Sequence, residues 1–358
     1  MLYRKYRPKN FSDFIGQKPI VETLKNAILK NKVAHAYLFS GPRGTGKTTL
    51  ARIFAKALNC LNLGKDAEPC NQCSNCQSFN EGNFLDLIEI DAASNRGIDE
   101  IRGIIEIVKV RPINGKKKVF IIDECHSLTK EAANAFLKTL EEPPDYVVFI
   151  LATTEPEKVL PTILSRTQKF QFRYLTVKEI SEKLKKIAES EKIKIEDDAL
   201  NLISIQAGGS LRDAETIFEK IINYFEGKIT RSDIENFFGM VKKEFIFNFL
   251  KFLIEKDKKK LLEIINSVFL EGYDLILFLE EILKFLRAIA FVKTNPELKT
   301  VVEKDFIGED FDEALKITEN LSLVNLQNYL NLFLTAYEQT KKEPPILTLP
   351  LELAILKI

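Results

Sequence analysis

Short apolar runs alternate with longer amphipathic patterns in the first half of the chain. The apolar runs lie at 35–40, 85–90, 118–123, 147–152 and 169–172. Amphipathic patterns with a helical period separate them at 48–58, 99–108 and 130–140. Alternating strands and helices form a parallel sheet, and strands that are apolar throughout are buried on both faces. The pattern therefore predicts an α/β domain at 1–175, with helices on both sides of a parallel sheet.

The pattern changes at about residue 176, where the strands stop. Four short amphipathic helices are expected at 177–193, 197–207, 210–225 and 230–238. Asp197 and Ser210 are suited to cap two of them, and Gly208–Gly209 marks a break between helices. The sequence thus predicts a small helical domain at 176–240.

The remainder of the chain, 241–358, is also helical in pattern but contains more Phe, Leu and Ile. Breaks between helices are expected near Gly272, near Asn295–Pro296 and at Glu343–Pro345. The whole chain contains 26 Phe, so this part has enough apolar side chains for a core of its own. We expect a third, all-helical domain, whose apolar side chains are buried within the chain or between subunits.

Length and charge narrow the class of protein. A chain of 358 residues corresponds to two or three domains. Lys and Arg total 52 and Asp and Glu total 51, so the net charge of +1 excludes a uniformly basic nucleic-acid coat but permits a local basic patch. No run of 18 apolar residues lacks a charge, and the N-terminus lacks the apolar segment of a secretory signal. We therefore expect a cytoplasmic protein without a membrane span, whose five cysteines are reduced.

The strongest motif is Gly41-Pro42-Arg43-Gly44-Thr45-Gly46-Lys47-Thr48, which matches the phosphate-binding pattern G-x-x-x-x-G-K-[ST]. It lies between an expected strand and an expected helix, as this pattern requires. The glycines allow a turn that points N–H groups at phosphate oxygens, and the helix adds its positive end. Lys47 would reach the β- and γ-phosphates, Thr48 would bind Mg²⁺, and Thr49 is counted with the nucleotide-binding residues. A glycine-rich turn that matches by chance is the alternative.

Two acids follow the apolar run Val119–Ile122. Asp123 is suited to hold Mg²⁺ through water, and Glu124 to polarise the water that attacks the γ-phosphate. An exposed strand end is the alternative, but Asp123 lies 76 residues after Lys47 in a strand–helix series, which favours catalysis. For Cys125 and His126, which come next, we expect packing or hydrogen bonding.

Four cysteines, Cys60, Cys70, Cys73 and Cys76, have the spacing C-x9-C-x2-C-x2-C. Four thiolates complete a tetrahedral shell around Zn²⁺, and such a closed site is structural rather than hydrolytic. Asn71, Gln72, Ser74 and Asn75 suit tight turns around a metal. An iron–sulfur cluster or unrelated buried thiols are the alternatives.

Further segments occur together in one known family. They are Tyr3–Pro8 with Phe14–Gln17, His35–Thr48, the last three cysteines of the cluster, Glu89–Ser94, Asp123–His126, Leu151–Thr154, Ile163–Arg166 and Gly209–Asp213. In this order they closely resemble the gamma/tau subunits of the bacterial DNA polymerase III clamp loader, a branch of the AAA+ ATPases. The resemblance extends from the first residue to about 240. It implies an AAA+ sheet domain with a zinc-binding insertion at 60–76, a helical lid and a C-terminal helical collar that makes lateral contacts between subunits.

The resemblance also implies roles for single residues. Thr154, chosen over Thr153, would reach the γ-phosphate or the water, the alternative being a β-branched strand end. Arg166 would reach the ATP of a neighbouring subunit, although the family's Ser-Arg-Cys is Ser-Arg-Thr here. Arg212 would contact the phosphates from the lid, unless it pairs with Asp213 or Glu215. Arg7 and Pro8 would lie against adenine and ribose.

The resemblance implies an ATP-driven motor that opens a sliding clamp and loads it onto primer–template DNA. Its partners would be delta and delta-prime type subunits in a hetero-oligomeric ring, and its cofactors ATP, Mg²⁺ and Zn²⁺. Arg96 and Arg102 are candidates for DNA contact, whereas Lys116–Lys118 is more typical of a solvated turn. Another AAA+ DNA motor, such as a Holliday-junction branch-migration ATPase, and a non-hydrolysing scaffold subunit of the ring are the rivals.

Overall fold

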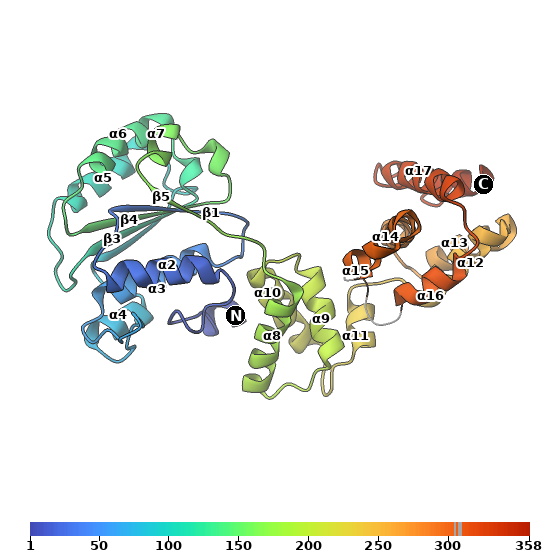
Figure 1. Cartoon of the computed structure of the whole chain (residues 1–358), viewed down its shortest axis with the longest axis horizontal. Coiled ribbons are helices and arrows are strands. Elements are labelled where there is room, and N and C mark those ends of the chain that lie inside the picture. The colour runs from blue at the N-terminus through green and yellow to red at the C-terminus, as the bar shows by residue number, and fades with distance from the viewer. Residues whose placement is uncertain (304–305, 307–309) are drawn as a thin grey trace. The chain divides into compact units, whose positions relative to one another are not determined.

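The computed structural model describes residues 1–303, 306 and 310–358, and Figure 1 shows their elements. Two compact units divide the chain at 229/230. No described helix is both long enough and apolar enough to cross a membrane.

A five-stranded sheet forms the centre of the first unit, Met1–Ile229. Its strands are β1 (Ala36–Ser40), β2 (Leu87–Asp91), β3 (Lys118–Asp123), β4 (Val147–Thr153) and β5 (Gln168–Gln171). The order is β2-β3-β4-β1-β5, and all four strand pairs are parallel. The predicted parallel sheet is therefore confirmed, and the carboxyl ends of β1, β3 and β4 meet at one edge.

Helices cover both faces of this sheet (Figure 1). On one face lie α2 (Lys18–Leu29) and α3 (Lys47–Asn59), and on the other lie α5 (Ile98–Val108) and α6 (Lys130–Glu141). A hydrophobic core lies on each face of the sheet, and alternate residues of β3 belong to one or the other. Val119 and Ile121 pack with α3, and Phe120 and Ile122 pack with α5 and α6. Burial on both faces explains why the strand is apolar throughout.

Several local expectations need correction. The helix α2 was not predicted, and α4 (Ser74–Glu81) contains Ser74 and Asn75, which we expected in turns. Lys118 is not part of a solvated turn: it opens β3, is buried, and donates a hydrogen bond of 2.7 Å to the carbonyl of Val110. That carbonyl follows the end of α5, where a cation is favourable.

Three helices follow the sheet in the first unit, namely α8 (Val177–Glu191), α9 (Asp197–Gln206) and α10 (Leu211–Tyr224). Thr176 and Glu179 form a capping box at the start of α8, and Ser210 caps α10 as expected. Glu196, rather than Asp197, occupies the capping position of α9. The short α1 (Leu2–Lys5) packs against α10, which brings the N-terminus to the lid helices.

The second unit, Thr230–Ile358, contains only helices among its described residues. They are α11 (Arg231–Phe237), α12 (Lys243–Glu255), α13 (Lys258–Leu270), α14 (Leu275–Thr294), α15 (Lys299–Val302), α16 (Asp310–Ile317), α17 (Leu323–Thr340) and α18 (Leu349–Leu356). The helix α11, which the pattern places in the predicted domain at 176–240, clusters with this compact unit. Phe249 meets Phe278 and Phe333 edge to face, so at least part of the apolar surface is buried within the chain.

Candidate functional site

The glycine-rich loop leaves the end of β1 and enters α3, as the motif requires. Gly44 has φ of +76°, and a Cβ atom there would lie 1.9 Å from the Ser210 hydroxyl oxygen. Gly46 has φ of +97°, and its Cβ atom would lie 2.7 Å from the Phe14 ring. Both positions therefore require glycine for backbone conformation and for space. The loop is enclosed by the lid on one side and by the N-terminal segment on the other.

Lys47 extends back across the loop. Its ammonium group donates hydrogen bonds to the carbonyls of Gly41 (2.8 Å) and Pro42 (2.9 Å). Burial lowers the pKa of Lys47, and the negative charges of Glu124 and Asp123 oppose this shift. Lys47 is only 6% exposed, so its charge is poorly hydrated. Such a buried cation is suited to bind a multiply charged anion, with which it forms strong charge-assisted hydrogen bonds.

Asp123 and Thr48 meet where β3 ends and α3 begins. The Thr48 hydroxyl donates a hydrogen bond of 2.7 Å to the Asp123 carboxylate. Hydroxyl and carboxylate oxygens are ligands that Mg²⁺ accepts, usually together with waters and phosphates. The donor set therefore fits the predicted magnesium site.

Glu124 is held by the end of the neighbouring strand β4. Its carboxylate accepts hydrogen bonds from the backbone N–H (3.2 Å) and the hydroxyl (3.0 Å) of Thr154. The backbone of Glu124 is left-handed, with φ of 48° and ψ of 45°. For a residue with a side chain this conformation costs on the order of 1 kcal/mol, and such conformations cluster at functional sites.

His126 and Cys125 lie behind the two acids. The Nδ1 atom of His126 is 2.8 Å from the Thr153 hydroxyl and 3.4 Å from the Glu124 carboxylate. Cys125 is buried in the core beneath α6, and burial raises the pKa of its thiol to about 12. Both residues have the packing and hydrogen-bonding positions that we expected, and His126 adds a second contact to the Glu124 carboxylate.

The lid contributes one wall of the pocket. The N–H of Leu211 donates a hydrogen bond of 3.1 Å to the carbonyl of Gly44, which ties the start of α10 to the loop. The Arg212 guanidinium carbon lies 5.1 Å from the centre of the Tyr3 ring. Within the described chain, Arg212 forms no ion pair with Asp213 or Glu215, the alternative considered from the sequence. The positive charge of Arg212 is therefore available to a ligand in the pocket.

One pocket collects most of the predicted nucleotide-binding residues: Arg7, Pro8, Arg43, Gly44, Thr45, Gly46, Lys47, Thr48, Thr49, Asp123, Glu124 and Arg212. The carbonyls of Gly41 and Pro42 accept hydrogen bonds from Lys47, and Thr154, which does not line the pocket, donates a hydrogen bond to the Glu124 carboxylate. Four further lining residues were not predicted: Tyr3, Phe14, Leu211 and Glu215. No motif marks them, because they reach the pocket only through the packing of the N-terminal segment and α10.

Three predicted arginines do not line this pocket. Arg166 follows the short helix α7 (Pro161–Leu164), where its guanidinium bonds the Thr162 carbonyl (2.8 Å) and pairs with Glu141. Arg96 is exposed in the loop before α5, and Arg102 on α5 pairs with Asp99 at 3.2 Å. The structure thus places all three away from the loop of their own chain, and their roles stay predictions.

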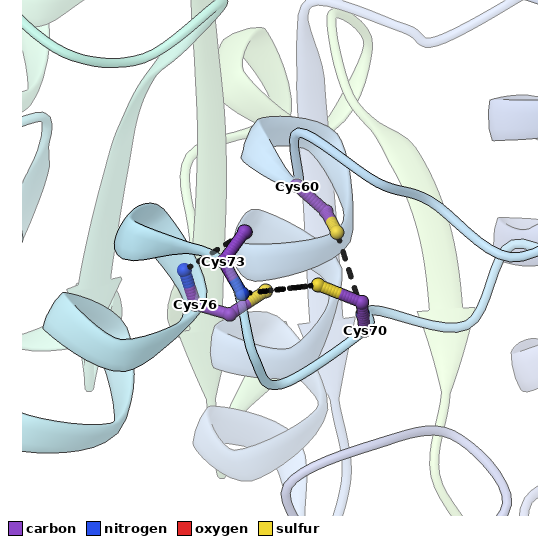
Figure 2. Close-up of side chains that lie close together, drawn as sticks. All are labelled: Cys60, Cys70, Cys73 and Cys76. Atoms are coloured by element: carbon purple, nitrogen blue, oxygen red, sulfur yellow. Dashed lines mark hydrogen bonds between the residues drawn. The ribbon is translucent and has the colours of Figure 1, made fainter.

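Figure 2 shows the four cysteines of the predicted metal site. Their sulfur atoms all lie within 4.8 Å of one another, and those of Cys70 and Cys76 are 3.9 Å apart. Tetrahedral zinc with Zn–S bonds of about 2.3 Å requires sulfurs roughly 3.8 Å apart. The arrangement therefore fits Zn²⁺.

Backbone N–H donors lower the pKa of the Cys70 and Cys73 thiols, whereas burial raises the pKa of Cys60 and Cys76. The N–H groups of Cys70 and Cys73 point at the sulfurs of Cys60 and Cys70, both at 3.3 Å. The backbone N–H of Gln72 is the main cause that lowers the pKa of Cys70 to about 6. Lys56 is buried beside the cluster and donates hydrogen bonds to Asn71 (2.5 Å) and Asn80 (2.9 Å). These contacts supply the outer support that metal-binding side chains usually have.

Known proteins share this sequence over most of its length. The chain is 40% identical over 327 residues to a DNA polymerase III subunit gamma of Buchnera aphidicola, covering 91% of this chain and 89% of that one. This chain belongs to the DNA polymerase III gamma/tau family. It is also 41% identical to the DNA polymerase III subunit tau of Bacillus subtilis, covering 100% of this chain and 62% of that one. The gamma/tau chain described here thus spans less than two thirds of that tau subunit.

Family models match consecutive parts of this gamma/tau chain. Residues 16–176 match the model described as DNA polymerase III, delta subunit. Residues 179–227 match the clamp loader subunit, ATPase lid domain, and residues 229–358 match gamma and tau domain III. The match to domain III extends the family resemblance beyond residue 240, where the sequence motifs ended.

Among solved structures, the gamma/tau chain is similar to RuvB of Thermotoga maritima, titled a Holliday junction branch migration motor. The TM-score is 0.50 and the sequence identity 23%, over 70% of this chain and 80% of RuvB. This likeness supports the AAA+ type of fold. The relatives at about 40% identity are DNA polymerase III subunits, whereas the likeness to RuvB, at 23% identity, shows the fold alone.

Proposed function

We propose that this chain is the ATP-hydrolysing motor subunit of a bacterial clamp loader, which loads a sliding clamp onto primed DNA. One observation carries the proposal: both acids at the end of β3 accept hydrogen bonds that fix their carboxylates beside the phosphate-binding loop. Thr48 donates to Asp123, and Thr154 donates to Glu124. A scaffold subunit that does not hydrolyse ATP would not need this arrangement.

The chain's own residues supply the parts of phosphoryl transfer. Lys47 and the loop N–H groups would hold the β- and γ-phosphates, and Glu124 would orient the water that attacks the γ-phosphorus while the bond to the β-phosphate oxygen breaks. Thr154 orients Glu124. Thr48 and Asp123 would hold Mg²⁺, which when bound neutralises phosphate charge.

Two arginines are proposed to couple this chemistry to assembly. Arg212 stands on the lid wall of the pocket without an acidic partner in the described structure, so phosphate contact would link nucleotide state to lid position. Arg166 does not line the pocket of its own chain and is held by the Thr162 carbonyl and by Glu141, so it would reach instead the ATP of a neighbouring subunit. A cation that arrives from a neighbour would make hydrolysis depend on the assembled ring.

The remaining roles follow the family. We propose one structural Zn²⁺ on the four cysteines, with an iron–sulfur cluster as the alternative. Delta and delta-prime type subunits would complete the ring, and Arg96 and Arg102 would contact DNA phosphates. The three-domain division at 175 and 240 remains our proposal for how the chain is organised in that ring.

The test is ATP hydrolysis by the chain assembled with its partner subunits. We expect sliding clamp and primed DNA together to raise the rate above that with either alone. A rate that does not respond to the clamp would contradict the clamp-loader function, and a ring in which Glu124→Gln in this chain leaves hydrolysis unchanged would identify a scaffold subunit.

A further inference from the structure

A buried carboxyl group lines the nucleotide pocket and has no role in the proposed mechanism. Glu215 lies on α10, one turn after Arg212, and is 5% exposed. Among the described residues it forms no hydrogen bond and no ion pair within 4 Å. Buried acids are usually paired, because an unpaired one loses the hydration of its charge. An unpaired acid that faces a binding pocket points to a ligand that supplies the missing partner.

The charged groups nearest to Glu215 differ from those nearest to the catalytic acids, which separates two ends of the pocket. The charged group that acts on it is Lys183 of α8, whose ammonium donates a hydrogen bond of 3.1 Å to the Tyr6 carbonyl. The charges that act on Lys47 are instead those of Asp123 and Glu124. Glu215 is therefore beside the N-terminal segment that continues into Arg7 and Pro8, and Lys47 marks the opposite, phosphate end.

Electrostatics determine which part of a nucleotide could lie beside Glu215. The phosphates belong with Lys47 and the N–H groups of the loop, because these supply the positive charge and the donors that a triphosphate needs. The part that reaches the other end is the ribose or the base. A base has both hydrogen-bond donors and acceptors on its edge, and these differ between adenine and guanine.

We propose that the Glu215 carboxyl group contacts the nucleobase and makes the pocket prefer adenine over guanine. This inference rests on the proposed function of the pocket as an ATP site. Adenine presents an acceptor (N7) next to a donor (the N6 amino group), whereas guanine presents two acceptors (N7 and O6) at the same positions. A neutral carboxyl group offers one donor and one acceptor, so it complements adenine at both positions and guanine at only one.

The surroundings of Glu215 favour the neutral form. Burial raises the pKa of Glu215 to about 7, and the positive charge of Lys183 opposes this shift. The other ionisable groups near this end of the pocket are Arg7 and Tyr3 from the N-terminal segment, Arg212 from α10, and Asp13, which acts on Lys183. Adenine preference should thus be strongest below neutral pH, where the carboxyl group keeps its proton.

The test compares the binding of ATP and GTP to the full chain and to two variants. Glu215→Leu removes both hydrogen-bonding positions, and we expect the ratio of ATP to GTP affinity to fall by about tenfold or more. Glu215→Gln is the matched control, because its amide retains one donor and one acceptor and should keep the preference. Between about pH 6 and about pH 8 the preference should fall for the wild type and stay constant for Glu215→Gln.

Each contrary result has a distinct meaning. A wild type that prefers ATP by the same factor as Glu215→Leu would overturn base recognition while leaving the ATP site intact. A variant that alters the ratio of ATP to 2′-deoxy-ATP affinity, and not that of ATP to GTP, would assign Glu215 to the ribose instead. A preference that is independent of pH in the wild type would overturn the neutral-carboxyl arrangement. A chain that binds no nucleotide would overturn both this inference and the proposed function.

Discussion

The Thr154 side chain and backbone both bind the carboxylate of Glu124, with the hydroxyl at 3.0 Å and the N–H at 3.2 Å. One residue at the end of β4 thus fixes the orientation of an acid at the end of β3. The relationship connects two neighbouring strands at the point where the nucleotide pocket opens. We therefore predict that Thr154 acts in hydrolysis by orienting Glu124.

Replacing Thr154 by Val should reduce the rate of ATP hydrolysis. The variant keeps the β-branched shape and the backbone N–H but loses the hydroxyl that orients Glu124, so kcat should fall about tenfold or more. The affinity for ATP should change little. Single-turnover hydrolysis and equilibrium binding separate the two effects. Thr154→Ser restores the hydroxyl, and a serine variant as slow as the valine variant would contradict orientation by this bond.

Replacing Lys47 by Ala should weaken nucleotide binding by on the order of tenfold or more, because the phosphates lose a charge-assisted partner. Titration with a fluorescent ATP analogue measures the affinity, and circular dichroism checks that the variant is folded. Lys56→Ala is the control, because it removes another buried lysine of the same helix that does not line the nucleotide pocket. Equal affinity of wild type and Lys47→Ala would mean that the loop does not bind phosphates.

Metal analysis should find about one zinc ion per chain, bound by four sulfurs. Replacing Cys73 by Ser should lower the zinc content strongly, whereas Cys125→Ser should leave it unchanged, because Cys125 lies in the core beneath α6. Chelation should increase hydrogen exchange at 60–76 more than it lowers ATP affinity. Absorption bands of iron, or a chain free of zinc, would exclude the zinc site.

Replacing Arg166 by Ala should leave ATP binding nearly normal but abolish hydrolysis in the assembled ring. The guanidinium is needed mainly in the transition state, so the loss should appear in kcat rather than in ATP affinity. In rings that mix Arg166→Ala chains with Lys47→Ala chains, activity should return only where an intact loop faces an intact arginine. If the variant reduces the basal hydrolysis of the isolated chain equally, then Arg166 acts on its own nucleotide.

The stability of the protein should depend on Glu215. Its pKa is raised from 4.5 to about 7 in the folded chain, so the neutral form is favoured by folding. The associated stability is fully present below about pH 4.5 and is lost as pH rises through about 7, by roughly 3 kcal/mol at most. Above neutral pH, Glu215→Gln should therefore have a higher free energy of unfolding than the wild type. Denaturant unfolding at several pH values measures this, and curves that stay parallel would show that Glu215 does not titrate in this range.

Much of this protein was determined by local sequence. Consecutive patterns specify the parallel sheet, the glycine-rich loop, the acids that end β3 and the group of four cysteines, because each depends on residues close together in the chain. The capping residue Ser210 belongs with them, since a cap needs only its own first turn. Sequence similarity then placed the chain in the gamma/tau family.

Only the tertiary structure decided what faces these motifs. Phe14 and Tyr3 reach the pocket because the N-terminal segment folds back over the loop, and Glu215 reaches it because α10 packs against Gly44. Lys118 reads as a surface charge in a basic run, yet it is buried against the end of α5. These positions depend on contacts between residues far apart in the chain, and the sequence pattern around each residue is that of an ordinary helix or turn. Hydrophobic periodicity reports which face of an element is buried but not what lies against it.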